Sequence, residues 1–303
     1  MKGVFFIKTD KKFKVLDIFY ITMMALPLIC LMVLKILTSP KVEGITVTGA
    51  RVFAEIPMPI QPLIISEAQI NSLAVLITLF FFCLYMTHGI DKRIKLKRQH
   101  FAEMIVEKVD ALVIENMGEY FKNYSPFIIS ILALSALSSL LSLLGLFPPT
   151  SDINVVAGWA VLVFILITYY KMKCGPLYYL KGFTEPVAFL APINFISEFA
   201  TPISMSFRHY GNILSGTVIS TLVAAGLSGL TAMLLGNLPG ILGEIPFLRI
   251  GLPAVLSIYF DVFSGCLQAF IFAMLTMLNI SGGFPLDEYE KRKLKKLARK
   301  QAN

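Results

Sequence analysis

The sequence predicts an all-α polytopic membrane protein, and three observations indicate this class. Hydrophobic residues make up 56% of the 303 residues and charged residues only 15%, whereas a soluble domain carries about a quarter charged residues. Uncharged apolar runs recur along the chain, and most reach or approach the roughly 20 residues that cross a bilayer as a helix. The basic residues gather in four clusters between these runs, at Lys2–Lys14, Lys92–Lys122, Lys171–Lys181 and Lys291–Lys300.

The positions of the basic clusters predict the membrane topology. Each cluster follows an even number of expected crossings, so the positive-inside rule favours about six crossings with both termini in the cytoplasm. The uncharged runs are Ile18–Leu34, Ala68–Ile90, Asn123–Ser151, Ile153–Tyr170, His209–Gly243 and Val262–Leu286. Because membrane spans separate the clusters, the net charge of +8 indicates topology and contact with membrane lipid, and no nucleic-acid partner.

The chain divides into three parts. Residues 1–66 are expected to form a retained signal-anchor helix followed by an external loop from Val42 to Ser66, which is rich in proline and valine. Residues 67–281 hold the other crossings, and residues 282–303 form a basic cytoplasmic tail.

The connection between the second and third crossings, Phe101–Asn123, alternates apolar and charged residues. In a helix, Ile105, Val109, Leu112 and Val113 would share one apolar face. This pattern predicts an amphipathic helix on the cytoplasmic face, packed on the membrane surface or docked to a partner.

The segment Pro186–Gly243 is too long for one upright crossing. As a helix it would run about 87 Å, against a hydrocarbon core of about 30 Å. It is therefore expected to be the first arm of a long tilted helix hairpin near the C-terminus, with Pro192, Pro202, Gly211 and Gly216 as points where it bends. A tilted helix offers a long lateral surface to another body.

Arg208 lies within this segment, where Glu198 is the only other formally charged residue. A guanidinium cannot become neutral by losing its proton. A permanent charge inside a membrane segment indicates a functional site. The alternative is an arginine at a helix end that extends its side chain to the lipid headgroups.

Polar residues flank Arg208 at helical spacing. At about 100° per residue, Ser204, Arg208 and Asn212 stand on successive turns of one face, and serine and asparagine can hydrogen-bond a guanidinium. On the last crossing, Asp261 and Gln268 differ by only about 20° around a regular helix.

Several interpretations of this polar seam remain open. Gly265 would permit close approach of a neighbouring helix. Arg208 and Asp261 could pair as a buried salt bridge in a noncatalytic assembly scaffold, or the seam could be an ion pathway. A secondary transporter that binds an anionic substrate at Arg208 is a further alternative, but the inverted repeats typical of that class are not found.

Five stretches carry a resemblance to a known family. They are NMG at Asn116–Gly118, PTSDIN at Pro149–Asn154, PINFISE at Pro192–Glu198, PISMSFRHYGN at Pro202–Asn212 and QAFIF at Gln268–Phe272. In this order they resemble the signatures of subunit a of bacterial F-type ATP synthases. The resemblance covers about Ser66–Ser281 and implies that residues 67–281 form a subunit a-like ion-channel domain.

The resemblance implies an ion-translocating stator subunit that itself catalyses no reaction. Two half-channels would load and unload the carboxylates of a rotating c-subunit ring, and so couple ion flow to ATP synthesis or hydrolysis. The implied partners are the c-ring, a b-type peripheral stalk and the remainder of the ATP synthase, in the bacterial inner membrane. No cofactor and no metal are expected, and the transported ion is H⁺, with Na⁺ as the alternative.

The family's functional residues map onto several positions of this sequence. Arg208 matches the essential arginine, which would lower the pKa of the ring carboxylate and block a direct leak. Gln268 matches the glutamine near that arginine, and Asn212 the asparagine one turn beyond it.

Two positions depart from the common pattern. Thr217 stands where many relatives carry Glu, and Asp261 where many carry His or Glu. Asp261 is therefore the candidate relay in a half-channel, while Thr217 can only hydrogen-bond water. The channel-lining candidates are Glu198, Asp152, Asn154, Thr217 and His209, with capping or local pairing as the alternative for both carboxylates and core packing for His209.

Overall fold

The computed structural model describes residues 11–38, 49–59, 62–90, 97–173, 175–184, 187–235 and 247–302. The α-helices are α1 (Lys11–Thr38), α2 (Glu67–Thr87), α3 (Lys97–Met117), α4 (Ser125–Leu140), α5 (Ile153–Lys173), α6 (Pro176–Phe183), α7 (Ala191–Leu235), α9 (Phe247–Ser257), α10 (Gly265–Gly282) and α11 (Leu286–Ala302). Short 3₁₀ turns are η1 (Glu119–Tyr124), η2 (Leu141–Leu144), η3 (Pro149–Ser151) and η4 (Ala188–Leu190), and η5 (Ile258–Ser264) is a π-helix. Within these described residues, six helical segments are long and apolar enough to cross a membrane, which confirms the predicted polytopic class.

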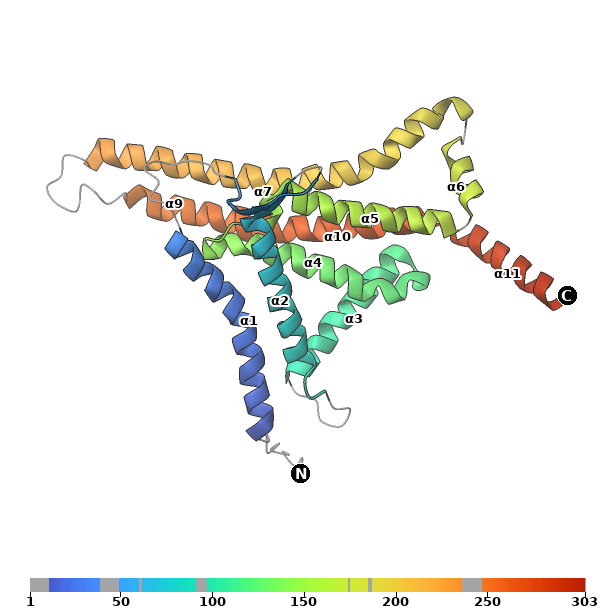
Figure 1. The fold of residues 1–303 in the computed structure, drawn as a ribbon, viewed down its shortest axis with the longest axis horizontal. Coiled ribbons are helices and arrows are strands. Elements are labelled where there is room, and N and C mark those ends of the chain that lie inside the picture. Colours follow the sequence, from blue (N-terminus) through green and yellow to red (C-terminus); the bar gives the residue numbers. More distant parts are fainter. Residues whose placement is uncertain are drawn as a thin grey trace.

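The helices form two groups with different directions. Helix α7 runs along the long axis of the molecule, with α5, α9 and α10 beside it and α4 packed on α10 (Figure 1). Helices α1 and α2 pack on each other and cross this layer steeply (Figure 1). The predicted long hairpin is therefore present, formed by α7 and by α9, η5 and α10 running back along it.

Helix α7 has 45 residues, so it is about 68 Å long and must lie strongly tilted in a hydrocarbon core of about 30 Å. Its N-terminal part, yellow in Figure 1, turns away from the rest, and Pro202 lies within this helix without an amide hydrogen to donate. The helix continues through Gly211 and Gly216. A Cβ on Gly216 would lie 3.0 Å from Phe260, so this glycine permits close contact between α7 and η5.

Two apolar clusters hold the layers together. The larger one joins α3, α4, α5 and α10 through buried residues that include Val113, Ile128, Val163 and Phe272. The smaller one lies where α1 and α2 meet the end of α4, and consists of Leu31, Ala74, Val75, Leu141 and Leu146.

The segment Val42–Ser66, predicted to be an external loop, contains two strands. Strands β1 (Val52–Ile56) and β2 (Leu63–Ser66) pair antiparallel, with Ile56 opposite Leu63, while residues 42–48, 60 and 61 lie outside the described residues. The prediction missed the strands because the prolines at 57 and 59 resemble loop signals, although β-branched and aromatic residues precede them.

Helix α3 has the predicted amphipathic face. Val113 is buried, and Ile105, Val109 and Leu112 are half-buried, whereas the glutamates of the opposite face are exposed. The apolar side packs against α4 and α10.

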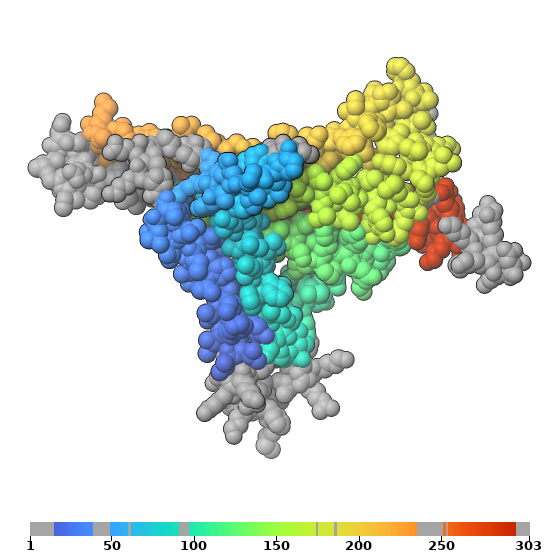
Figure 2. All heavy atoms as spheres, in the orientation of Figure 1, coloured from blue at the N-terminus to red at the C-terminus, as the bar shows by residue number. Residues whose placement is uncertain are grey.

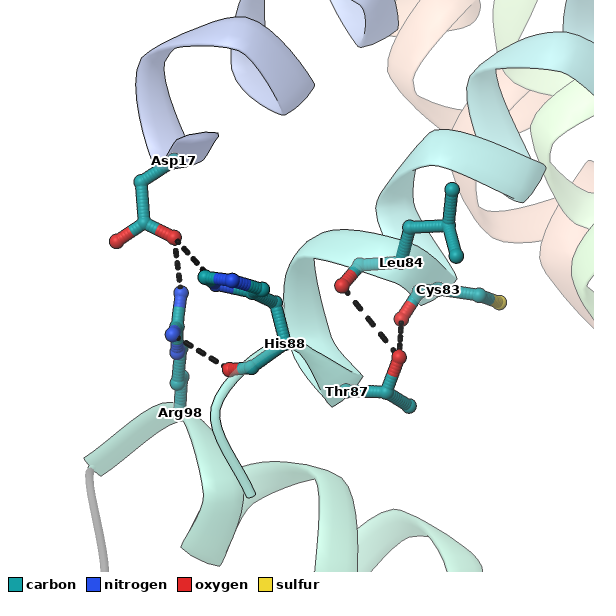
Figure 3. Close-up of polar contacts among 6 residues, drawn as sticks. All are labelled: Asp17, Cys83, Leu84, Thr87, His88 and Arg98. Atoms are coloured by element: carbon teal, nitrogen blue, oxygen red, sulfur yellow. Dashed lines mark hydrogen bonds and ion pairs between the residues drawn. The ribbon is translucent and has the colours of Figure 1, made fainter. Parts of the chain in front are cut away.

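A polar junction fixes the lower end of α1 (Figure 3). The guanidinium of Arg98 donates from Nη1 to Asp17 Oδ1 at 2.6 Å and from Nη2 to the His88 carbonyl at 2.6 Å. His88 Nδ1 lies 3.6 Å from Asp17 Oδ1. Because these residues belong to α1, the end of α2 and the start of α3, the junction ties three helices at one point.

Candidate functional site

Arg208 is exposed on the outer surface of α7. Within the described part of the chain its guanidinium has no hydrogen bond and no ion pair, and it forms no salt bridge with Asp261. Ser204 is exposed beside it, but does not hold the guanidinium. The side-chain amide of Asn212 turns instead to the last crossing, where Nδ2 donates to Ser264 Oγ at 2.8 Å. Among the described residues the hydrogen bonds expected between Arg208 and the side chains of Ser204 and Asn212 are therefore not formed.

Asp261 lies on the π-helix η5, and its carboxylate accepts a hydrogen bond from Ser257 Oγ. The predicted common stripe with Gln268 assumed a regular α-helix. A π-helix bonds i to i+5 and turns less per residue, so the assumed angle is wrong. Asp261 is half-buried and borders a cavity, whereas Gln268 is buried inside the bundle on α10.

The cavity beside Asp261 has a volume of about 300 Å³ and is called the Asp261 cavity below. Polar side chains of α7 line one wall, which contains Thr217, Ser220 and Thr221. The opposite wall comes from the turn between α4 and α5, where Gly145 adopts φ 69°, a conformation that favours glycine. Its carbonyl accepts a hydrogen bond from Lys35 Nζ of α1.

A second cavity, the Glu198 cavity, has a volume of about 580 Å³ and lies between α5, α6, α7 and α10. Lys171 Nζ donates to both carboxylate oxygens of Glu198, at 2.8 and 2.6 Å. Tyr179 OH lies 3.5 Å from Glu198 Oε1. Burial, and then the negative charge of Glu198, raise the pKa of Tyr179, so its hydroxyl remains protonated and able to donate.

Arg208 lies between the two cavities along α7. Thr201 lines the Glu198 cavity and Thr217 lines the Asp261 cavity. At 1.5 Å per residue, these positions are about 10 Å and about 14 Å from Arg208 along the helix axis. The one helix thus carries polar residues to both cavities, with a cation between them.

Two other candidates, Asp152 and His209, have local partners. Asp152 Oδ1 accepts from the backbone N–H of Asn154 at 2.9 Å and so caps the start of α5, while the Asn154 side chain is exposed. His209 is fully buried, with its ring against Trp159 and Phe272 and Nε2 3.4 Å from Ser135 Oγ. These are the contacts of a packed core residue.

Four polar partners were missed by the sequence analysis: Lys171, Tyr179, Ser257 and Ser264. Lys171 is 27 residues from Glu198, and Ser264 is 52 residues from Asn212, so no spacing rule connects them. Only Ser257 carried a signal, because it stands four residues before Asp261.

This fold and site define a class: a polytopic helical membrane subunit that presents a fixed cation on a tilted helix between two polar cavities. The family model described as ATP synthase A chain matches residues 69–281. The chain belongs to this family, and is therefore an ion-translocating stator subunit in the membrane sector of an ATP synthase, which disfavours the transporter and scaffold alternatives.

Individual relatives agree with the family assignment. The chain is 31% identical over 232 residues to ATP synthase subunit a 1 of Pelobacter propionicus, covering 74% of this chain and 91% of the relative. It is 31% identical over 230 residues to ATP synthase subunit a of Geotalea daltonii, covering 73% and 90%. A sodium ion specific ATP synthase subunit a of Propionigenium modestum is 31% identical over 210 residues, covering 64% and 65%.

Proposed function

We propose that Arg208 is the fixed cation that faces the carboxylates of a rotating c-subunit ring, and that the two cavities are the inner ends of two half-channels. The observation that carries this proposal is the place of Arg208: it is exposed on α7, lacks an ion-pair partner among the described residues, and stands between the Glu198 and Asp261 cavities.

The charge of Arg208 performs two tasks in this mechanism. A guanidinium near a ring carboxylate lowers the pKa of that carboxylate and favours release of its ion. The same charge repels a cation that would pass directly between the cavities, by about 4 kcal/mol at 4 Å separation in an environment of effective dielectric constant 20. Ions therefore cross only on the ring, which couples their flow to rotation.

The surface around Arg208 suits contact with a ring of helices. Ile203 and Phe207 are 54% and 62% exposed, and a shallow apolar groove lies next to them, lined by Phe195, Ile196, Phe199, Ala200, Ile203 and Ser204. An apolar surface with a single cation excludes water while leaving one charge for the ring carboxylate. A b-type peripheral stalk is the second proposed partner, alongside the remainder of the synthase.

We assign the chain to the bacterial inner membrane with both termini in the cytoplasm, from the positive-inside pattern. In this orientation the β1–β2 hairpin is external, so the Asp261 cavity opens outward and the Glu198 cavity opens inward. The proposed ion is H⁺, and Na⁺ is the alternative because a sodium ion specific relative is among the similar proteins.

The test is ion-driven ATP synthesis in membrane vesicles that carry Arg208→Ala. We expect coupled synthesis to be lost in a complex that still assembles, because ion release from the ring then lacks its cation. Lys108→Ala on α3 removes an exposed cation that lines neither cavity and serves as the control. Retained coupled synthesis with Arg208→Ala would contradict the proposed role, and loss of assembly in that variant would favour a scaffold.

A further inference from the structure

The N-terminal extension, defined as residues 1–68, precedes the family match at 69–281, yet its described part packs on the matched body. Leu31 of α1 is buried against α2 and the end of α4. Thr78 Oγ1 of α2 donates to the Met24 carbonyl at 3.1 Å. With the Asp17–Arg98 contact at the other end (Figure 3), α1 is fixed along its length. In Figure 2 the dark blue residues belong to α1 and the light blue residues to the β1–β2 hairpin, and both lie against the long helical layer.

The extension also lines the Asp261 cavity. Lys35 of α1, Arg51 before β1 and Glu67 at the start of α2 border the same space as Asp261. The four charged residues in the described lining are thus two cations and two carboxylates, and three of the four come from the extension. The cavity is partly built by a segment that lies outside the family match.

Glu67 is a buried carboxylate with a loosely held partner. Its side chain is 10% exposed, and Oε2 lies 3.7 Å from Arg51 Nε. A charge-assisted hydrogen bond between such groups is typically about 2.7–2.9 Å. Within the described residues, no hydrogen bond reaches this carboxylate. Arg51 divides its donors, since Nη1 also donates to the Thr38 carbonyl at 3.3 Å. The Glu67 oxygens therefore retain capacity for a water molecule or a small cation.

We propose that Glu67 is an outer cation-relay residue of the half-channel that contains Asp261, and that Arg51 is the displaceable counter-ion that holds its carboxylate at the cavity mouth. This inference rests on the proposed function of the Asp261 cavity. A monovalent cation, H⁺ or Na⁺, would bind Glu67 in place of Arg51 and pass through the cavity water to Asp261. Lys35 and Arg51 limit how many cations gather at the mouth, because like charges repel.

A purely mechanical role for the pair makes a different prediction. The backbone N–H of Glu67 donates to the Arg51 carbonyl at 2.7 Å, so the ion pair could simply pin the hairpin to α2. A mechanical link needs only opposite charges at positions 51 and 67, whichever position carries the positive charge. A relay needs the carboxylate at position 67.

The experiment compares passive ion flux through the membrane sector, in vesicles freed of the catalytic head, for Glu67→Gln, Arg51→Gln and the double exchange Arg51→Glu with Glu67→Arg. We expect Glu67→Gln to slow flux by roughly tenfold, the lower end of the effect of cleft charges on ion entry. Arg51→Gln should keep or raise the flux, and the double exchange should remain slow. Glu55→Gln, an exposed carboxylate on the same hairpin, is the matched control.

Two results would overturn the relay: wild-type flux in Glu67→Gln, or recovery of flux in the double exchange. Quantified subunit content in each purified complex ensures that flux is compared at equal assembly. Asp261→Asn is measured in parallel. If it slows flux while Glu67→Gln does not, the relay at Glu67 fails and the proposed half-channel stands. If neither slows flux, the half-channel fails as well.

Discussion

Asp261 is the residue on which, at the smallest scale, the proposed outward half-channel depends. Thr217, across the same cavity, donates Oγ1 to the Ile213 carbonyl at 3.0 Å. A threonine in this position can accept a hydrogen bond from water but cannot hold a charge. Of the two carboxylates in the described lining of this cavity, Asp261 is the one within the family match. It lies on the π-helix η5.

Asp261→Asn should slow ion flux while the complex assembles normally. The change keeps the shape of the side chain and an oxygen to accept from Ser257, but removes the negative charge that attracts the cation. We expect a decrease on the order of tenfold or more. Vesicle flux and ATP synthesis rates measure it, with Asp287→Asn on α11 as an exposed control. Wild-type rates in Asp261→Asn would remove this residue from the pathway.

Gly265 provides a second prediction at the residue scale, because it sets how closely α10 approaches α4. A Cβ at this position would lie 2.9 Å from Ser139 Cβ. Gly265→Ala should destabilise the subunit by about 1–3 kcal/mol, the usual cost of overpacking. Gly158→Ala on α5 meets nothing within 4 Å, and should be neutral or stabilising by up to about 1 kcal/mol. Thermal inactivation of the purified complex compares the two; equal midpoints would contradict the close contact.

The sequence alone identified Arg208 but not the partners of the polar residues, and the reason is physical. Arg208 is visible in a sequence because a permanent charge in an apolar segment is costly wherever the chain folds. The partners of polar residues are not visible in this way. Lys171 and Glu198 form their contact across 27 residues, and Asn212 and Ser264 across 52, so only the packed helices bring them together.

At the scale of elements, length was predictable and local irregularity was not. The apolar run around Arg208 is too long for an upright crossing, which predicted a tilted helix, and α7 is a single helix of 45 residues. The π-helix η5 follows no composition rule, since its seven residues, Ile258–Ser264, read as an ordinary apolar helix. Its wider turn moved Asp261 off the predicted stripe. The β1–β2 hairpin was hidden by prolines that mark turns as readily as loops.

The pairing of elements also explains why the two cavities differ. The Glu198 cavity lies where short α6 leaves a gap beside α5 and α7, and the Lys171–Glu198 pair spans that gap. The Asp261 cavity lies where α1 and the hairpin approach the turn after α4. The Glu198 cavity is therefore lined mostly by residues within the family match, and the Asp261 cavity partly by the N-terminal extension.

At the scale of the whole molecule, the number of crossings determines which side each terminus occupies. The described residues contain six candidate spans, and an even number places both termini on one side. Helix α1 is the crossing that precedes the family match. Its apolar side chains remain exposed; Ile36 and Leu37, for example, have 76% and 79% of their surface exposed. Lipid or a neighbouring membrane helix would cover such a surface.

Reporter fusions check this topology directly. We expect green fluorescent protein fused after Asn303 to fluoresce, and alkaline phosphatase fused after Met58, just past β1, to be active, because this phosphatase folds only outside the cytoplasm. Phosphatase fused after Glu103 on α3 is the matched control and should be inactive, since the basic residues near α3 retain that helix inside. Activity at position 103 but not at position 58 would invert the assignment, and the Asp261 cavity would then open to the cytoplasm. A silent C-terminal fluorescent fusion beside an active phosphatase at position 58 would require an even number of crossings between these two positions, and one of the five candidate spans that follow α1 would then fail to cross the membrane.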